Sequence, residues 1–294
     1  MPFLRLIIAV VVRMPLRASA STICKEVLKL AFTRPHSNEA LSTADAIRCR
    51  ITGAYEEKYG PDGYCFEDLL GVDIDLFEIA YKPGKWTLLH RFTLSHLWEQ
   101  WNYHRRKSGE EFIGDAHRLI FHYGTPFSIR IYPDLSAHKD HLFDQLLQPL
   151  KQISHEVFCI LFSDKELMRT FSIKVSEAIA DACPSEYPNH LEATGVMKRT
   201  SFWPTWLREA LFYRENGRCA KCSSSLTGVF DPTLKPQVDH IVPISNGGTT
   251  DPTNLQYLCE PCNKKKGNRS NEAGGFIYVP WQYSPSKFSR IRID

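Results

Sequence analysis

Cys219-Ala-Lys-Cys222 and Cys259-Glu-Pro-Cys262 are the two stretches that decide how the C-terminal part of this 294-residue chain folds. Each Cys-x-x-Cys pair can place two sulfurs about one tetrahedral edge apart, so two pairs can converge on one zinc ion. A thioredoxin-like redox site needs only one such pair, and a secreted disulfide framework is usually denser and shorter. The sequence therefore predicts a structural Zn²⁺ site with the ligands Cys219, Cys222, Cys259 and Cys262.

An Asp-His pair lies between the two cysteine pairs, in Val238-Asp239-His240-Ile241-Val242-Pro243. His240 is the only histidine among residues 191–294 and suits a general base, while the Asp239 carboxylate suits Mg²⁺ or Mn²⁺. Side chains alternate along a strand, so a bare Asp-His pair is weak evidence for a shared site. The turn-rich Ser245-Asn246-Gly247-Gly248 could bring Asn254 back across this strand, which strengthens the case for a hydrolytic site.

This part of the chain resembles the HNH endonucleases, which have a ββα-metal fold, in the form with a four-cysteine zinc site. The resemblance is carried by the two cysteine pairs, the Asp-His motif, Asn254-Leu-Gln and the Cys262-Asn263 end. The resemblance covers about residues 203–270. It implies a hairpin with Asp-His on its first strand and a closing helix after the second cysteine pair. It also implies that His240 is the general base and that Asn254 holds its imidazole through a backbone or side-chain hydrogen bond.

The same resemblance implies that Asp239 and Asn263 bind the catalytic ion. The last histidine of the family pattern is Asn263 in this chain. Because an amide oxygen is a hard, neutral ligand, the expected ion is Mg²⁺ or Mn²⁺ rather than zinc or nickel.

Positive charge is concentrated near this motif. Residues 196–294 hold 14 Lys+Arg and 8 Asp+Glu, a net charge of +6, whereas residues 1–195 hold 22 and 25, a net charge of −3. Only the C-terminal part has the balance of a polyanion-binding protein. The expected nucleic-acid contacts lie on the closing helix and are Lys264, Lys265, Lys266 and Arg269. Further candidates for backbone contacts are Arg208, Arg214 and Arg218.

Two kinds of segment are expected in the rest of the chain. Helices are predicted at 20–32, 40–58, 88–107, 142–153 and 164–182, and strands at 3–12, 127–132 and 156–162. A further helix begins near Pro204 and would pack against the zinc module, with Trp206, Ala210 and Tyr213 on one stripe and Leu207 and Leu211 beside it. The expected fold class is α+β, with a mixed, helix-rich N-terminal domain followed by the ββα-metal module.

Pro184, Pro188 and Gly195 interrupt the periodic patterns and mark a domain boundary. We expect a target-selection or regulatory domain at 1–190, the nuclease domain at 196–275 and a tail at 276–294. Eight histidines lie between residues 90 and 155, but none has the spacing of a metalloprotease-like site, so surface and interface positions are the simpler interpretation.

The expected location is the cytoplasm. The apolar run at residues 6–12 is far shorter than the ~20 residues that span a bilayer. Five cysteines have no shared ligand spacing and read as reduced thiols; they are Cys24, Cys49, Cys65, Cys159 and Cys183.

Three functions are compatible with these patterns. The favoured one is a DNA endonuclease of a bacterial restriction or anti-phage defence system, with DNA, a defence-system protein and a second copy of the chain as possible partners. The second is a structure-selective or recombination nuclease of the host or of a mobile element, which prefers branched or nicked DNA to plain duplex. The third is a zinc-stabilised nucleic-acid-binding module without catalysis, in which Asp239 or His240 would be expected to be missing. Both are present.

Overall fold

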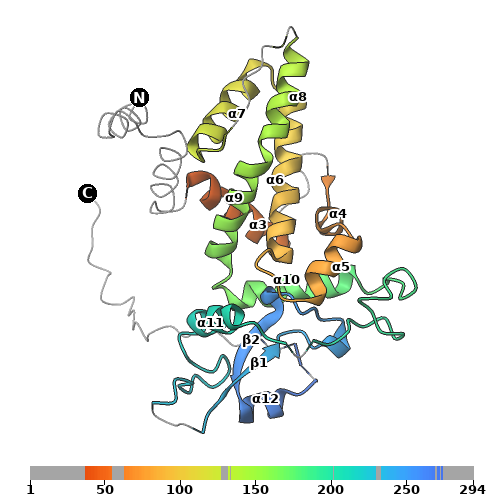
Figure 1. Ribbon diagram of the computed structural model, residues 1–294, viewed down its shortest axis with the longest axis vertical. Helices are drawn as coiled ribbons and strands as arrows, with labels where there is room; N and C mark the ends of the chain where they lie inside the picture. The colour runs from red at the N-terminus through yellow and green to blue at the C-terminus, as the bar shows by residue number, and fades with distance from the viewer. Residues whose placement is uncertain are drawn as a thin grey trace, which may run out of the picture.

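The computed structural model describes residues 37–54, 63–126, 132, 134–200, 202–229, 233–268, 270, 271 and 273. Helices form an elongated upper part and a small two-stranded sheet lies below them, with α10 between the two (Figure 1). No helix among the described residues is long and apolar enough to cross a membrane. The fold is α+β, with a helix-rich N-terminal region and a small sheet-plus-helix module at the C-terminal side.

The helices of the upper part, here called the helical region, are α3 Asn38–Thr52, α4 Phe66–Leu70, α5 Ile74–Tyr81, α6 Leu88–Lys107, α7 Glu110–His122, α8 Leu135–Gln145, α9 Leu147–Leu161 and α10 Lys165–Ala178. Several begin at side-chain caps that satisfy free backbone N–H groups. Asp164 accepts from Leu167 N before α10, and Thr87 caps α6. Gly53 ends α3 in the left-handed conformation at φ 74°, which is why that helix stops short of residue 58.

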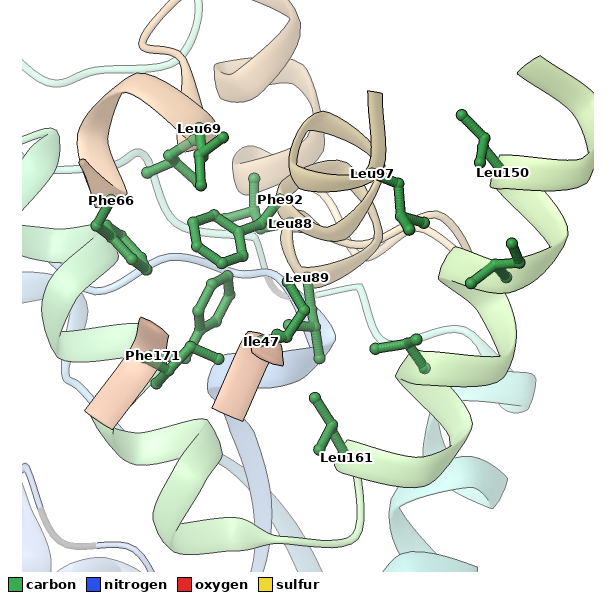
Figure 2. Close-up of a cluster of buried hydrophobic side chains, with 14 of the residues drawn as sticks. Ile47, Phe66, Leu69, Leu88, Leu89, Phe92, Leu97, Leu150, Leu161 and Phe171 are labelled. Atoms are coloured by element: carbon green, nitrogen blue, oxygen red, sulfur yellow. The ribbon is translucent and has the colours of Figure 1, made fainter. Parts of the chain in front are cut away.

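One apolar core holds these helices together. α9 packs against both α6 and α3, and α10 packs against α3 and α4. Phe66, Phe92 and Phe171 meet in the centre, with ring centroids 4.7 to 5.8 Å apart (Figure 2). Such aromatic contacts add directional stabilisation to the burial of large apolar area.

The predicted elements are confirmed in part. The helix at 88–107 has the bounds of α6, and those at 40–58 and 164–182 correspond to the shorter α3 and α10. The strand predicted at 156–162 is wrong, because residues 156–161 continue α9. Its short apolar run hides a helical period, since Ile153, Val157 and Leu161 are buried at spacings of four. The helix predicted at 142–153 crosses the boundary between α8 and α9.

Predictions at 3–12 and 20–32 lie outside the described residues, as do 276–294 and nearly all of 127–132.

The small sheet belongs to a second unit, here called the C-terminal module. Strand β1 Pro236–His240 pairs antiparallel with β2 Leu255–Cys259, with Asp239 opposite Gln256 and His240 opposite Leu255. Helix α12 Glu260–Lys266 follows β2 directly and packs against both strands. Helix α11 Thr205–Arg214 packs on β2, as the sequence predicts. Its buried residues are Leu207 and Leu211, whereas Tyr213 of the predicted stripe is 77% exposed.

The module is joined to the helical region through buried polar contacts. The Asp251 carboxylate accepts from the backbone N–H of Leu88 at 2.9 Å, and so satisfies a free donor in the first turn of α6. Thr250 N donates to the Ala80 carbonyl at 2.8 Å. Lys165 at the start of α10 pairs with Glu215 at 2.9 Å, and both side chains are buried. The two parts are therefore packed together, and the division of the chain near residues 190–196 stays a prediction.

Candidate active site and zinc site

The four predicted zinc ligands lie together. The metal-ligating atoms of Cys219, Cys222, Cys259 and Cys262 are all within 4.8 Å of one another. The sulfurs of Cys222 and Cys259 are 3.7 Å apart, close to the edge of about 3.8 Å for a tetrahedron with Zn–S bonds of about 2.3 Å. The donor set and its geometry fit a structural zinc ion.

Local backbone structure builds this cluster from two tight turns. After Cys219, the chain reverses at Ser223, which has a left-handed φ of 63°, and Ser223 N donates to the Cys219 carbonyl. Ala220 N donates to the Tyr257 carbonyl at 2.9 Å and docks the first turn on β2. The second pair comes from the end of β2 and the first turn of α12, where Pro261 fits without an N–H partner.

Asp239 and His240 lie at the end of β1, where Lys266 at the C-terminal end of α12 reaches both residues. The cysteine-bearing start of α12 lies at the other end of the strand pair. Gln256 Nε2 donates to Asp239 Oδ2 at 2.9 Å from the facing strand position. Lys266, at the end of α12, places its Nζ 3.1 Å from the same oxygen. Burial raises the pKa of Asp239 above its usual value, although the nearby Lys266 and Gln256 oppose that shift.

The His240 ring is largely enclosed. Its Nε2 atom is buried and has no hydrogen-bond partner among the described residues, while the ring centroid lies 5.7 Å from that of Trp203. Burial lowers the pKa of His240 to about 4, and the charges of Lys266 and Arg199 add to this effect. The imidazole is therefore neutral near pH 7 and can accept a proton.

Asp239 and His240 share one small pocket of about 150 Å³. Strand alternation would direct these neighbours to opposite faces, but His240 is the last residue of β1 and both line the pocket. The other lining residues are Arg199, Thr200, Pro243, Ile244, Gly267 and Asn268. The pocket thus joins a carboxylate, a neutral imidazole and an arginine.

Asn254 serves the loop that follows His240. Its side-chain oxygen accepts from Val242 N at 2.8 Å, and its amide donates to the carbonyls of Val242 and Thr249 at 2.9 and 2.8 Å. Its backbone carbonyl accepts from Ile241 N at 2.7 Å. The side chain therefore closes the loop, and the link to His240 runs through the backbone of the next residue rather than through the imidazole.

Close packing in the same loop explains one of its glycines. A Cβ atom at Gly248 would overlap the Val242 carbonyl oxygen, so only glycine fits there. The Ser245-Asn246-Gly247-Gly248 run does form the turn that returns the chain to β2.

The expected metal ligand Asn263 is half-buried on α12, while that end of the helix reaches the pocket through Gly267 and Asn268. Asn263 does not line the pocket in the described structure. Its role as a ligand stays a prediction.

The expected nucleic-acid contacts separate into two kinds. Lys264 and Lys265 are exposed, and Lys264 pairs with Glu260 at 2.5 Å. Lys266 does not have the expected solvent-facing position for a nucleic-acid contact. Its side chain is 1% exposed, and its Nζ donates to the His240 carbonyl at 2.6 Å. It supports the site from within and does not face solvent. Arg269 lies outside the described residues.

Arg214 also differs from the expected backbone contact. Its side chain is 2% exposed, and its guanidinium donates to the Leu255 carbonyl and pairs with Glu215 at 2.7 Å. It lies over the Phe162 ring, 4.6 Å from the centroid. Arg214 therefore ties α11 and β2 to the end of α9.

Comparison with known proteins addresses the C-terminal module. Residues 219–269 match the family model described as HNH endonuclease. The module belongs to the HNH family. Membership indicates a nuclease, with nucleic acid as the class of substrate, for this part of the chain. No curated protein and no solved structure matches the chain.

Sequence reasoning missed several residues of the HNH site. Gln256 and Trp203 contact Asp239 and His240 from a facing strand and from the segment before α11. Gln256 could have been found from the sequence, because the expected hairpin pairs the Asp239 strand with the strand that follows Asn254, and Gln256 lies opposite Asp239 in that pair. No local signal marks Arg199 or Trp203, because their approach depends on how the preceding chain packs.

Proposed function

We propose that the HNH module is a metal-dependent endonuclease that hydrolyses DNA phosphodiester bonds. The observation that carries this proposal is the shared pocket of Asp239 and His240 beside a four-cysteine cluster. In phosphodiester hydrolysis a base must take a proton from water while positive charge stabilises the phosphate. A neutral histidine and an oxygen ligand in one pocket provide places for both.

The oxygen donors available at the pocket fit a hard divalent ion. Asp239, with Asn263 as its predicted partner, would hold Mg²⁺ or Mn²⁺, which supplies charge stabilisation for the phosphate and the departing 3′ oxygen. Gln256 and Lys266 hold the Asp239 carboxylate by its Oδ2 atom. Cys219, Cys222, Cys259 and Cys262 would hold a structural zinc ion that fixes the end of β2 against the start of α12.

His240 is the proposed general base. Its ring is held against Trp203, and its backbone carbonyl is fixed by Lys266. A water in the pocket would give up a proton to the His240 imidazole as its oxygen attacks phosphorus in line with the leaving 3′ oxygen. The proton from the attacking water is carried away by His240, and the departing 3′ oxygen takes up a proton from solvent, so that the products carry a 5′ phosphate and a 3′ hydroxyl.

The helical region has the proposed role of target selection or regulation. Its contacts with the loop 241–254, through Leu88 and Ala80, give it a direct connection to the site. We propose a restriction or anti-phage defence role in the bacterial cytoplasm, based on the pairing of a nuclease module with an unmatched partner region. One module carries one site, so a two-fold dimer would suit cleavage of both strands.

The test is cleavage of supercoiled plasmid by the purified, zinc-loaded protein with Mg²⁺ or Mn²⁺. Asp239→Ala should slow cleavage at least about a hundredfold, because it removes an ion ligand. Asp144→Ala provides a matched control, since Asp144 is exposed on α8. Equal zinc content in all three proteins shows that the module is folded. The proposal fails if folded wild type leaves the plasmid intact with both ions, or if Asp239→Ala cuts as fast as wild type.

A further inference from the structure

One wall of the HNH pocket comes from the segment before the matched module. Arg199 and Thr200 line the pocket with Asp239 and His240, although the family match begins only at residue 219. Trp203, from the same segment, lies against the His240 ring. The site is therefore a composite of the module with Arg199, Thr200 and Trp203.

This segment is anchored on the helical region. Leu191 and Met197 form an antiparallel bridge, and both are buried in the large core with exposed fractions of 3% and 2%. Lys198 N donates to the His190 carbonyl at 2.8 Å, and its Nζ donates to the Pro188 carbonyl at 2.7 Å. The His190 ring lies 5.7 Å from that of Tyr81 on α5. These contacts hold the chain immediately before Arg199, so its position at the pocket depends on the helical region.

Arg199 has the properties of a phosphate ligand. The side chain is exposed and lies at the pocket, near enough for its charge to disfavour protonation of His240. Lys266, the other cation at the site, is committed to Asp239 and the His240 carbonyl. A guanidinium can bind a phosphate through two parallel N–H donors, and it stays charged at any pH at which the protein is folded.

We propose that Arg199 binds a phosphate of the DNA backbone at the mouth of the pocket, so that the helical region, through the segment it anchors, supplies part of the substrate site. This inference rests on the proposed nuclease function. Phosphate contacts set the position of the duplex without reading its sequence. Arg199 would place the scissile bond over Asp239 and His240.

The binding experiment uses a labelled duplex and full-length protein in Ca²⁺, which supports binding in the absence of cleavage, with fluorescence anisotropy at several salt concentrations. Arg199→Ala should weaken binding roughly tenfold, the loss expected for a charge-assisted hydrogen bond. It should also reduce the slope of log K against log salt by about 1. Arg199→Lys keeps the charge and should keep the slope, with intermediate affinity. Arg169→Ala, on α10 and paired with Glu166, is the control and should match wild type.

The cleavage experiment uses the same proteins with Mg²⁺ or Mn²⁺, at equal zinc content. Arg199→Ala should raise KM more than it lowers kcat, because the contact is made in the bound substrate as well as in the transition state. If wild type binds and cuts DNA while Arg199→Ala behaves like Arg169→Ala, the assignment of Arg199 is overturned and the nuclease stands. If wild type neither binds nor cuts DNA, both proposals are overturned.

Discussion

The helical region and the HNH module are stabilised in different ways. The helical region buries a large apolar core, centred on Phe66, Phe92 and Phe171, that needs no ligand. The module has a two-stranded sheet, short helices and a much smaller apolar cluster, of which Cys219 and Cys259 are themselves members. An isolated two-stranded sheet is marginal in water, so the module depends on its metal and on its neighbour.

This difference explains where the polar chemistry lies. Asp239, His240 and Lys266 are at least half-buried in the small module. Burial raises the pKa of Asp239 and lowers that of His240, and Lys266 is paired with Asp239. The helical region also buries two imidazoles, those of His90 and His96 on α6, although the sequence favours surface and interface positions for its histidines. The comparison suggests that the helical region provides a rigid support and that the module provides the reactive site.

The largest effect is expected from loss of zinc. Cys259→Ser, or a chelator, should release the ion and unfold residues 219–268, because apparent zinc-binding energies of about 10–16 kcal/mol act as folding energy. Zinc content and hydrogen exchange would show loss of protection in the module, with α6 and α9 still protected. Cys159→Ser, which changes an exposed thiol on α9, should do neither. Full zinc in Cys259→Ser would contradict the four-cysteine assignment.

A substitution in the apolar core should destabilise the helical region while the zinc site keeps its ligands. Phe171→Ala removes a fully buried ring that contacts Phe66 and Phe92, and should cost about 3–5 kcal/mol of unfolding free energy. Denaturant unfolding would measure the loss in the presence of zinc. Phe121→Ala, at a ring that is 55% exposed, should cost far less. Similar losses for the two variants would mean that the core is not organised around Phe171.

Within the module, two lysines two positions apart provide a sharper comparison. Lys266→Met leaves Asp239 without its buried cation and should cost about 3 kcal/mol. Lys264→Met breaks only the exposed pair with Glu260 and should cost well under 1 kcal/mol. Thermal unfolding of zinc-loaded protein measures both. Equal shifts in Tm would show that Lys266 is solvated like Lys264.

A smaller effect concerns the junction and its pH dependence. Burial raises the pKa of Asp251 to about 6, despite hydrogen bonds from Thr253 and Leu88. Because the folded pKa is higher than the unfolded one, this group stabilises the protein fully below pH 4, and that contribution is lost as pH rises through 6. Relative to Asp251→Asn, wild type should therefore be about 2–3 kcal/mol less stable at pH 7 than at pH 4. A difference that is flat, or of opposite sign, in chemical unfolding at the two pH values would contradict this account.

Much of the site could be predicted because its signals are local. The spacing of Cys219, Cys222, Cys259 and Cys262 is sufficient to predict a zinc cluster, and Leu88–Lys107 carries a helical pattern along its whole length. Asp239 and His240 line one pocket because β1 ends at His240. The sequence indicates this shared site only through its resemblance to the family pattern.

What could not be predicted depends on contacts between distant segments. The run 156–162 resembles a strand until its partners on α3 and α6 are known, since a short apolar run fits either period. Lys266 is one of three consecutive lysines, and only the packing of α12 on β1 shows which one is buried. The capping of α6 by Asp251 joins residues 163 positions apart, so no local rule could indicate it.

The role of His240 as general base is tested by the single-turnover rate of duplex cleavage by wild type and His240→Ala, measured with Mg²⁺ or Mn²⁺ at equal zinc content. His240→Ala should be slower by about a hundredfold to ten-thousandfold, with DNA binding retained, because the variant lacks only the general base. Equal rates for the two proteins would contradict this role, since hydrolysis would then not depend on the pocket formed by Asp239 and His240.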